Sequence, residues 1–175
     1  MKDIRLGRLR GMDVLMAPTA QACSLALYAV VFVVTFVFLR FSIQSAVVGA
    51  ALVVALHWFS EILHNYGHFM AARASGHPMT GVKLVWVLGQ SLYPADEGEV
   101  PAAVHVKRAL GGPRFSAIVA VVMVVLAFIA YQVDIRLNWV LIVIAADNVF
   151  VFTIGAFLPL GFTDGSTLLR YAGKT

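Results

Sequence analysis

The sequence predicts an all-α polytopic membrane protein with about four transmembrane helices and a small membrane-associated β segment after the second helix. Composition supports this class in two ways: 61% of the 175 residues are hydrophobic and only 13% are charged, and the mean hydropathy is +0.87. A soluble domain is about half apolar and about a quarter charged. The third observation is a set of runs that approach the roughly twenty apolar residues needed to cross a bilayer.

The apolar runs divide a single integral membrane domain, residues 1–175, into four candidate spans. The first run is rich in Val and Phe, and the second becomes more polar toward its end. A cleaved signal peptide is not expected, because the first run is long for the apolar region of a signal. The spans are predicted at residues 22–39, 47–73, 115–133 and 138–158.

The distribution of basic residues predicts the orientation of these spans. Eleven of the thirteen Lys and Arg residues lie before the first span, between the second and third, or after the fourth. The positive-inside rule makes these three segments cytoplasmic. We therefore expect an integral protein of a bacterial or archaeal cell membrane with both termini in the cytoplasm. Its N-terminal arginines would contact anionic headgroups of the lipid bilayer, and no sequence pattern indicates a nucleic-acid partner.

The connection between the second and third spans predicts the β segment. The sequence Gly76-His77-Pro78 ends the preceding helix. Within residues 82–88, apolar side chains sit two positions apart, at Val82, Leu84, Trp86 and Leu88, a spacing typical of short strands or an interfacial segment. The acidic, turn-rich residues 93–99 are expected to form a solvated loop.

The second span contains the residues that indicate chemistry. His57, Glu61, His64 and His68 fall within an arc of about 60° on a helix. Ionisable groups are costly inside a membrane and usually face the protein interior or a watery cavity. His64 and His68 are four residues apart, which suits two ligands of one metal ion. For a single histidine such as His57, hydrogen bonding to another helix is the simpler interpretation.

Asp164 is the candidate third metal ligand. His64 and His68 lie toward the cytoplasmic end of the second span, and Asp164 follows the cytoplasmic end of the fourth, so the two segments can meet at one depth. Pro159 and Gly161 favour a turn between the fourth span and Asp164. The alternative is that Asp164 caps a short helix at residues 165–171, because aspartate is a favoured N-cap.

Three motifs in order resemble those of the site-2 proteases, which are intramembrane zinc metalloproteases. The first resembles the family pattern H-E-x-G-H-x-x-x-A, the second resembles G-P-x-x-N, and the third resembles N-x-x-P-x-x-x-x-L-D-G. Together with an N-terminal stretch like the family's lead-in to its first span, they cover most of the chain. Here the motifs read His64-x-x-Gly67-His68 followed by Ala71-Ala72-Arg73, then Gly112-Pro113, then Leu158-Pro159 with Asp164-Gly165.

The resemblance implies a zinc ion held by His64, His68 and Asp164 within the bilayer near its cytoplasmic face. In the family a water occupies the fourth position, the metal lowers its pKa, and a glutamate takes its proton during attack on the scissile carbonyl. The segment after the metal-binding helix would form a small membrane-embedded sheet. Substrates would be transmembrane segments that unwind to reach the metal.

Three positions depart from the family pattern. Asn65 stands where the family has its catalytic Glu, and a carboxamide cannot act as general base, a role worth roughly 10²–10⁴ in rate. Ala156 replaces the Asn three residues before Pro159, and Phe115 or Ser116 stands at the Asn position of the second motif. Together these changes indicate a natural, divergent branch.

Glu61 is a possible substitute for the missing carboxylate. It lies one turn before His64 and would act as a relocated base or as a fourth metal ligand. Along the helix axis, however, Glu61 is about 6 Å away from position 65. The alternative is that Glu61 is a structural partner for His57 or Asp147.

Three functions are compatible with these residues, and the sequence does not decide whether the chain is an enzyme. The first is a zinc-binding protein of the site-2 protease type whose cleavage of transmembrane segments is weakened or lost. The second is a non-catalytic pseudoprotease that binds transmembrane partners as a subunit of a membrane complex. The third is a haem- or chlorophyll-binding subunit, because histidines in membrane helices can ligate such cofactors. The sequence gives no indication of the oligomeric state.

Overall fold

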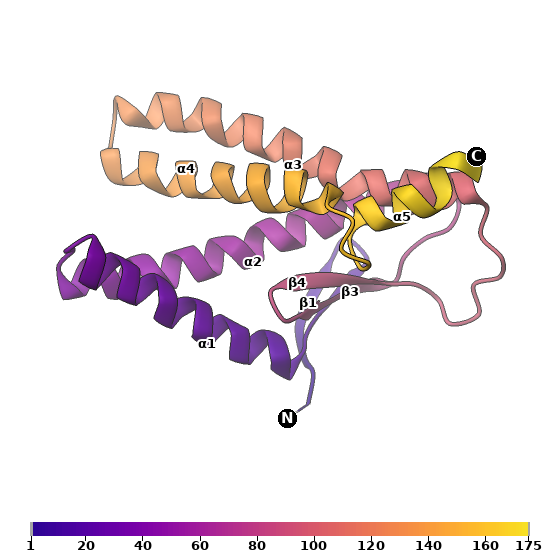
Figure 1. Cartoon of the computed structure of the whole chain (residues 1–175), viewed down its shortest axis with the longest axis horizontal. Helices are drawn as coiled ribbons and strands as arrows, with labels where there is room; N and C mark the ends of the chain where they lie inside the picture. Colours follow the sequence, from indigo (N-terminus) through magenta and orange to yellow (C-terminus); the bar gives the residue numbers. More distant parts are fainter. Residues whose placement is uncertain (1, 175) are drawn as a thin grey trace.

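A computed structural model describes residues 2–174, which form a bundle of long helices with a small sheet at one end (Figure 1). Within these residues, four helical segments are long and apolar enough to cross a membrane. The helices are α1 (Pro18–Val33) continued by η1 (Val34–Phe38), α2 (Ile43–Ala74), α3 (Ala102–Tyr131), α4 (Ile135–Val149) continued by η2 (Phe150–Ile154) and η3 (Gly155–Phe157), α5 (Asp164–Tyr171) and η4 (Ala172–Lys174).

The observed helices cover the predicted spans but differ from them at the ends. The largest difference is in α3, which begins at Ala102 although the sequence placed the start of the third span at Phe115. The sequence Gly111-Gly112-Pro113 lies just before Phe115 and is typical of a break in a helix. Proline normally interrupts a helix, because it lacks the N–H that would bond the carbonyl four residues earlier. Here the helix continues through Pro113 to Tyr131.

Helix α2 is long enough to reach beyond the hydrocarbon. Its N-cap is Ser42, whose side chain accepts a hydrogen bond from the Ser45 amide, and the chain leaves the helix at Gly76 with a positive φ of 77°. Thirty-two residues span about 48 Å at 1.5 Å per residue, whereas a bilayer core is about 30 Å thick. His64 and His68 lie about 30 Å or more from the helix start.

The sheet has four strands in the order β1-β2-β3-β4, and only half of it was predicted. The pair β3 (Gly81–Val85) and β4 (Leu88–Leu92) is the β segment expected after the second span. The hairpin of β1 (Ile4–Leu9) and β2 (Met12–Met16) was not foreseen. Strand β2 pairs in parallel with β3, so the N-terminus joins a sheet formed about seventy residues later.

The inner face of the sheet packs against α2 and forms the main core. Its buried apolar residues come from β2, β3 and the polar half of α2. Trp58 on α2 also donates a 2.9 Å hydrogen bond from Nε1 to Ser24 Oγ on α1, which ties the first two helices together. The core comprises Met12, Val14, Ala20, Trp58, Phe69, Ala72, Met79, Val82 and Leu84.

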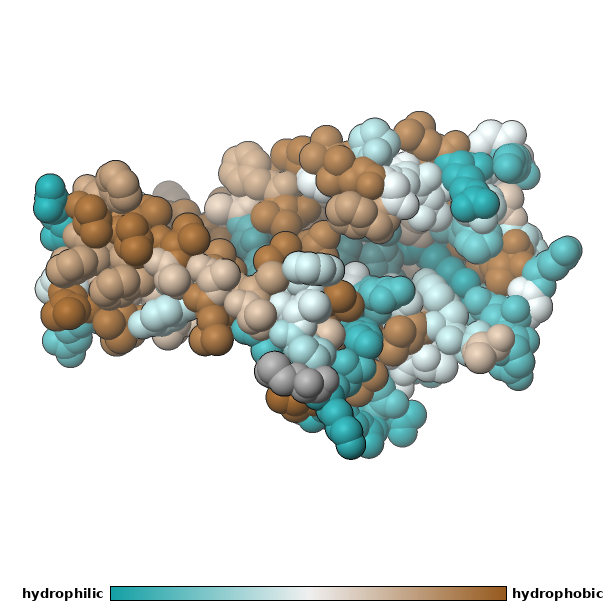
Figure 2. All heavy atoms as spheres, turned by 60° about the horizontal axis from the view of Figure 1, so that its bottom comes forward, coloured by the Kyte–Doolittle hydropathy of each residue, from teal (hydrophilic) through white to brown (hydrophobic). Residues whose placement is uncertain are grey.

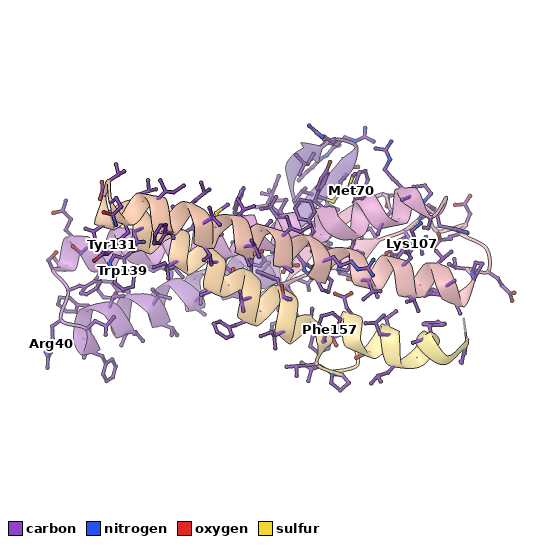
Figure 3. The ribbon with its side chains drawn as sticks, turned by 90° about the horizontal axis from the view of Figure 1, so that it is seen from above. Arg40, Met70, Lys107, Tyr131, Trp139 and Phe157 are labelled. Atoms are coloured by element: carbon purple, nitrogen blue, oxygen red, sulfur yellow. The ribbon has the colours of Figure 1, made fainter. Side chains whose placement is uncertain are left out.

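The surface divides into an apolar part and a polar part along the long axis. Figure 2 shows hydrophobic residues covering the end away from the sheet, and hydrophilic residues gathering around the sheet and the C-terminal segment. Exposed valines, leucines and phenylalanines cover the four long helices. Arg40, Tyr131 and Trp139 lie together at the end away from the sheet, and Lys107 lies at the opposite end (Figure 3). This surface suits a protein embedded in a lipid bilayer.

Candidate metal centre

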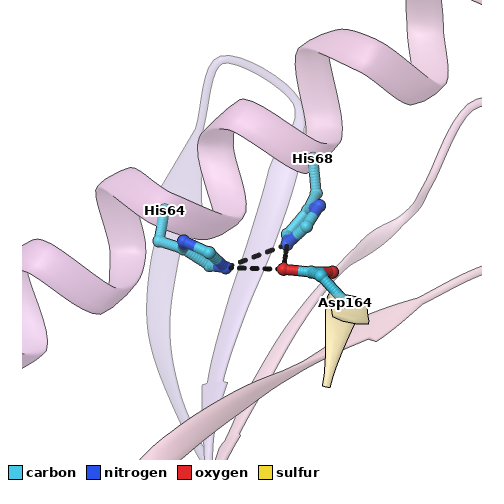
Figure 4. Close-up of side chains that lie close together, drawn as sticks. All are labelled: His64, His68 and Asp164. Carbon is cyan, nitrogen blue, oxygen red and sulfur yellow. Dashed lines mark hydrogen bonds and ion pairs between the residues drawn. The ribbon is translucent and has the colours of Figure 1, made fainter. Parts of the chain in front are cut away.

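The structure brings together the three residues proposed from the sequence as metal ligands. Asp164 Oδ2 lies 3.4 Å from His64 Nε2 and 3.4 Å from His68 Nε2 (Figure 4). The two Nε2 atoms are 3.0 Å apart. The rings are nearly perpendicular, so both nitrogens point at the same place. Among residues 2–174 this is the group of His, Cys, Asp and Glu whose ligand atoms, all within 4.8 Å of one another, can hold a metal ion.

The Nδ1 atoms of both rings have hydrogen-bond partners that fix the orientation of the rings. His68 Nδ1 lies 2.8 Å from the backbone oxygen of Arg108. The Gly112 amide lies 3.2 Å from the same nitrogen, so two backbone groups hold the ring with Nε2 facing His64 and Asp164. His64 Nδ1 lies 3.1 Å from Ser116 Oγ. Partners of this kind orient metal-binding histidines in proteins generally.

Gly112 leaves the space beside the three ligand atoms free. A Cβ at this position would lie 2.3 Å from His68 Nε2 and 2.6 Å from His64 Nε2, closer than side-chain atoms tolerate. Two imidazole nitrogens and one carboxylate oxygen are a donor set that catalytic zinc sites use. The three donor atoms converge, and with both Nε2 atoms deprotonated they fit a divalent metal such as zinc.

Close helix packing places these groups within reach of one another. A Cβ at Gly67 would lie 2.4 Å from the Gly111 carbonyl oxygen, and a Cβ at Gly111 would lie 2.6 Å from that of Gly67. Helices α2 and α3 are therefore in backbone contact beside the histidines. A similar approach occurs at Gly165, where a Cβ would lie 2.1 Å from the Phe157 oxygen. Gly67 of the first motif and Gly111, next to the second motif, thus allow the two helices to pack closely.

Asp164 is the first residue of α5, and the capping interpretation is wrong. The N-cap position is held by Thr163, and no side-chain cap bond is formed there. The Asp164 side chain instead points toward the histidines and is largely buried. Burial alone would raise the pKa of Asp164, but hydrogen bonds to His64 and His68 hold it below its ordinary value.

Asn65 and Glu61 form a buried pair that is attached to strand β4. Asn65 Nδ2 donates to Glu61 Oε1 at 2.6 Å and to the Glu61 backbone oxygen at 3.1 Å. The Gly89 amide donates to the same Glu61 oxygen at 2.5 Å, and Ser91 Oγ donates to Asn65 Oδ1 at 3.4 Å. Glu61 is absent from the group of converging ligand atoms. Its hydrogen bonds go to Asn65 and Gly89, not to His57 or Asp147 as the structural alternative supposed.

These contacts continue along α2 as a regular series. His57 Nε2 lies 2.8 Å from the Val87 oxygen, one turn before the contact of Glu61 with Gly89. Four helical residues rise about 6.0 Å, and two strand residues rise about 6.6 Å. Helix and strand therefore stay in step, and successive turns of α2 meet Val87 just before β4 and then Gly89 and Ser91 within it. This series holds the β3–β4 hairpin against α2.

The polar residues of α4 bond across to α2, as expected from their cost in a membrane. His57 Nδ1 lies 3.4 Å from Asp147 Oδ1, and Asn148 Nδ2 donates to Ser60 Oγ at 2.9 Å. The simpler interpretation of His57, hydrogen bonding to another helix, is confirmed by this contact. Neither Asp147 nor Asn148 lies within the group of converging ligand atoms.

Arg108 is a site residue that the sequence analysis missed. Its backbone oxygen holds His68, and its buried guanidinium bonds the Glu97 carboxylate and the His77 oxygen. The guanidinium also lies 4.0 Å from the centre of the Tyr93 ring. Hydrogen bonds from Arg108 lower the pKa of Glu97 below its ordinary value. Arg108 thus binds the acidic loop to α3, the helix whose backbone orients His68. No local sequence pattern indicates this contact.

Comparison with known proteins identifies the fold. A site-2 protease from Methanocaldococcus jannaschii matches with a TM-score of 0.64 at 19% sequence identity. The match covers 97% of this chain and 70% of that one. This chain has the site-2 protease fold. No protein-family model and no curated protein matched the sequence in the other two comparisons.

Within the site-2 protease fold, the three departures from the family motifs occupy distinct places. Asn65 is buried beside β4. Ser116 takes the Asn position of the second motif and contacts His64, so it retains a polar group there. Ala156 is buried in η3 and has no polar side chain to offer a bound backbone.

Proposed function

We propose that this chain is a divergent member of the site-2 protease family that binds zinc through His64, His68 and Asp164. We further propose that its cleavage of transmembrane segments is weakened or lost. The convergence of the three ligand atoms from α2 and α5 carries the metal assignment. The site-2 protease fold supports the family. The carboxamide of Asn65 supports the reduced activity.

The residues divide into ligands and groups that hold them. His64, His68 and Asp164 would bind the ion, while Ser116 and the Arg108 carbonyl keep the two rings turned toward it. A zinc ion bound there would act as a Lewis acid and lower the pKa of a water. Asn65 cannot take a proton near neutral pH, and its Nδ2 is already engaged by Glu61.

Glu61 is the candidate substitute base. Its Oε1 is committed to Asn65 and Gly89, whereas its buried Oε2 has no hydrogen-bond partner among residues 2–174. A free carboxylate oxygen is what a base requires. The Glu61 carboxylate also gives a specific test of the pseudoprotease alternative. If the chain cleaves nothing, removing this carboxylate leaves the cleavage rate unchanged. The haem or chlorophyll alternative is disfavoured, since the two Nε2 atoms converge on one small volume shared with a carboxylate.

The first experiment measures the metal content of the purified full chain. We expect about one zinc per chain, and less than a tenth of that for the double variant His64→Ala, His68→Ala. Asn148→Ala is the matched control, because it removes a polar group from the neighbouring α4 outside the ligand cluster and should keep its zinc. A wild-type protein without metal after purification in zinc-containing buffer would contradict the assignment.

The second experiment measures cleavage of a reporter transmembrane segment in a bilayer. We compare wild type with Asn65→Glu, Glu61→Ala and the exchanged variant Glu61→Asn, Asn65→Glu. The exchanged variant is needed because Asn65→Glu alone places two carboxylates side by side. Activity gained only with Glu at position 65 identifies a pseudoprotease. Activity present in wild type and lost in Glu61→Ala identifies Glu61 as the base. Full activity in both wild type and Glu61→Ala would contradict the proposed loss.

A further inference from the structure

A cavity of about 350 Å³ lies between α1, α2 and α4, and its lining includes none of the three candidate metal ligands. Its volume is at the lower end of the range for ligand sites, about 300–1,000 Å³. The wall is almost entirely apolar, with Leu27 from α1, Val53 from α2 and Val143 from α4. The tip of the β3–β4 hairpin closes one side. Two ionisable side chains, His57 and Asp147, complete the lining.

The His57–Asp147 pair gives this cavity a hydrogen-bond acceptor. The Val87 carbonyl lies 2.8 Å from His57 Nε2, so this nitrogen carries a proton. His57 Nδ1 then faces Asp147 Oδ1 at 3.4 Å. Asp147 Oδ2 is buried and has no partner among the residues that the structure describes. A buried acceptor without a donor is costly, which points to a donor supplied by a bound molecule.

The cavity is next to the metal centre. The ring of Phe152 lies between the two sites, with centroid distances of 5.5 Å to the His57 ring and 5.5 Å to the His64 ring. Phe152 is carried by η2, where α4 changes to a π-helix. Such π segments are frequent at functional sites. One side chain therefore separates an apolar cavity within the span region from the candidate ligands.

We propose that this cavity binds an apolar polypeptide segment that donates a hydrogen bond to Asp147, with a serine or threonine hydroxyl as the preferred donor. The inference rests on the proposed function, since it assigns the cavity to the same transmembrane partner or substrate. Three features favour a polypeptide: branched apolar walls, one acceptor within them, and the short distance to the metal ligands. Asp147 then determines specificity for the segment.

The test uses two synthetic transmembrane peptides of about twenty Leu and Ala residues, identical except for one central Ser or Ala. The full-length protein is reconstituted in nanodiscs of phosphatidylcholine and phosphatidylglycerol. It carries the photoreactive residue p-benzoylphenylalanine in place of Val143. We expect the Ser peptide to crosslink about fivefold more than the Ala peptide, the gain typical of one hydrogen bond. Equal crosslinking would overturn the proposal, and this comparison requires no change at Asp147.

Two controls separate this proposal from others. The same probe in place of Val124, which lines a second apolar cavity between α3 and α4, should show no preference for the Ser peptide. Asp147→Leu should abolish the preference while zinc content stays the same. If the purified protein contains no zinc but still crosslinks the Ser peptide preferentially, the cavity proposal is supported and only the metal assignment is contradicted. Displacement of the Ser peptide by diacylglycerol, a lipid with a free hydroxyl, would overturn the proposal in favour of a lipid site.

Discussion

At the scale of single residues, the candidate metal centre depends on groups that hold the ligands as much as on the ligands. His64 and His68 could be identified from spacing alone, because residues four apart share a helix face. Ser116 and Arg108 could not, because their relation to the histidines is established only when α3 packs on α2. Gly112 likewise reveals its role only in three dimensions, where a Cβ would fill the space next to both Nε2 atoms.

Ser116→Ala tests the orienting role. The change removes one oxygen from a fully buried position and leaves the volume nearly the same, so the fold should persist. We expect zinc affinity to fall by roughly 10–100-fold, as is typical when the partner of a metal-binding histidine is removed. Competitive titration with a zinc chelator measures this change. Ser24→Ala is the control, because it also removes a hydroxyl that makes a hydrogen bond between helices, but at a part-buried position on α1. Equal affinities for wild type and Ser116→Ala would contradict the role.

At the scale of elements, packing between α2 and α3 is the feature that the rest of the site requires. The two helices meet through Gly67 and Gly111 with backbone against backbone. Membrane helices commonly use small residues in this way, since lipid offers no hydrophobic driving force for helix association. The contact brings the Arg108 carbonyl and Ser116 to the histidines.

Gly67→Ala tests this packing. Its Cβ would lie 2.4 Å from the Gly111 oxygen, so the helices must separate. We expect a loss of about 1–3 kcal/mol in the free energy of unfolding, the usual cost of overpacking. Gly49→Ala is the matched control, because it lies in the same helix with nothing within 4 Å of its Cβ. That change should be neutral or stabilising by about 0.5–1 kcal/mol. Unfolding in mixed micelles measures both, and a similar effect for the two variants would contradict the packing role.

The elements also show which parts of the fold the sequence could predict. The spans and the β3–β4 hairpin follow from local hydropathy and alternation. The β1–β2 hairpin does not, because Arg5 and Arg8 alternate with exposed Ile4 and Leu6 and resemble a headgroup-binding tail. Its place is set by parallel pairing of β2 with β3, which no local pattern encodes. The start of α3 was missed because Pro113 is tolerated inside a helix that neighbouring helices support.

At the scale of the whole molecule, the ends of the bundle differ in chemistry. The sheet, the acidic loop and the C-terminal helix gather at one end, and the two short connections, residues 39–42 and 132–134, lie at the other (Figure 1). The metal ligands lie toward the end with the sheet. If that end faces the cytoplasm, as the positive-inside rule predicts, the candidate site opens to the cytoplasmic side.

Cysteine accessibility tests this orientation. The single native cysteine, Cys23, is first replaced by Ala. A cysteine is then placed at Gly98 in the acidic loop or at Arg40 in the connection between α1 and α2, both exposed. In intact cells a membrane-impermeant maleimide should label the Arg40→Cys protein and leave the Gly98→Cys protein unlabelled until the cells are broken. The opposite labelling pattern would reverse the orientation and place both termini outside the cytoplasm.

The central claim is that α2 and α5 share one metal ion, and X-ray absorption at the zinc edge of the loaded full-length protein tests it most directly. We predict about two nitrogen ligands at about 2.0–2.1 Å together with oxygen at about 2.0–2.2 Å. Asp164→Ala should lose the carboxylate oxygen and keep both imidazoles, so that water supplies the remaining oxygen ligation. A sulfur shell at about 2.3 Å, or a spectrum unchanged by Asp164→Ala, would contradict the account.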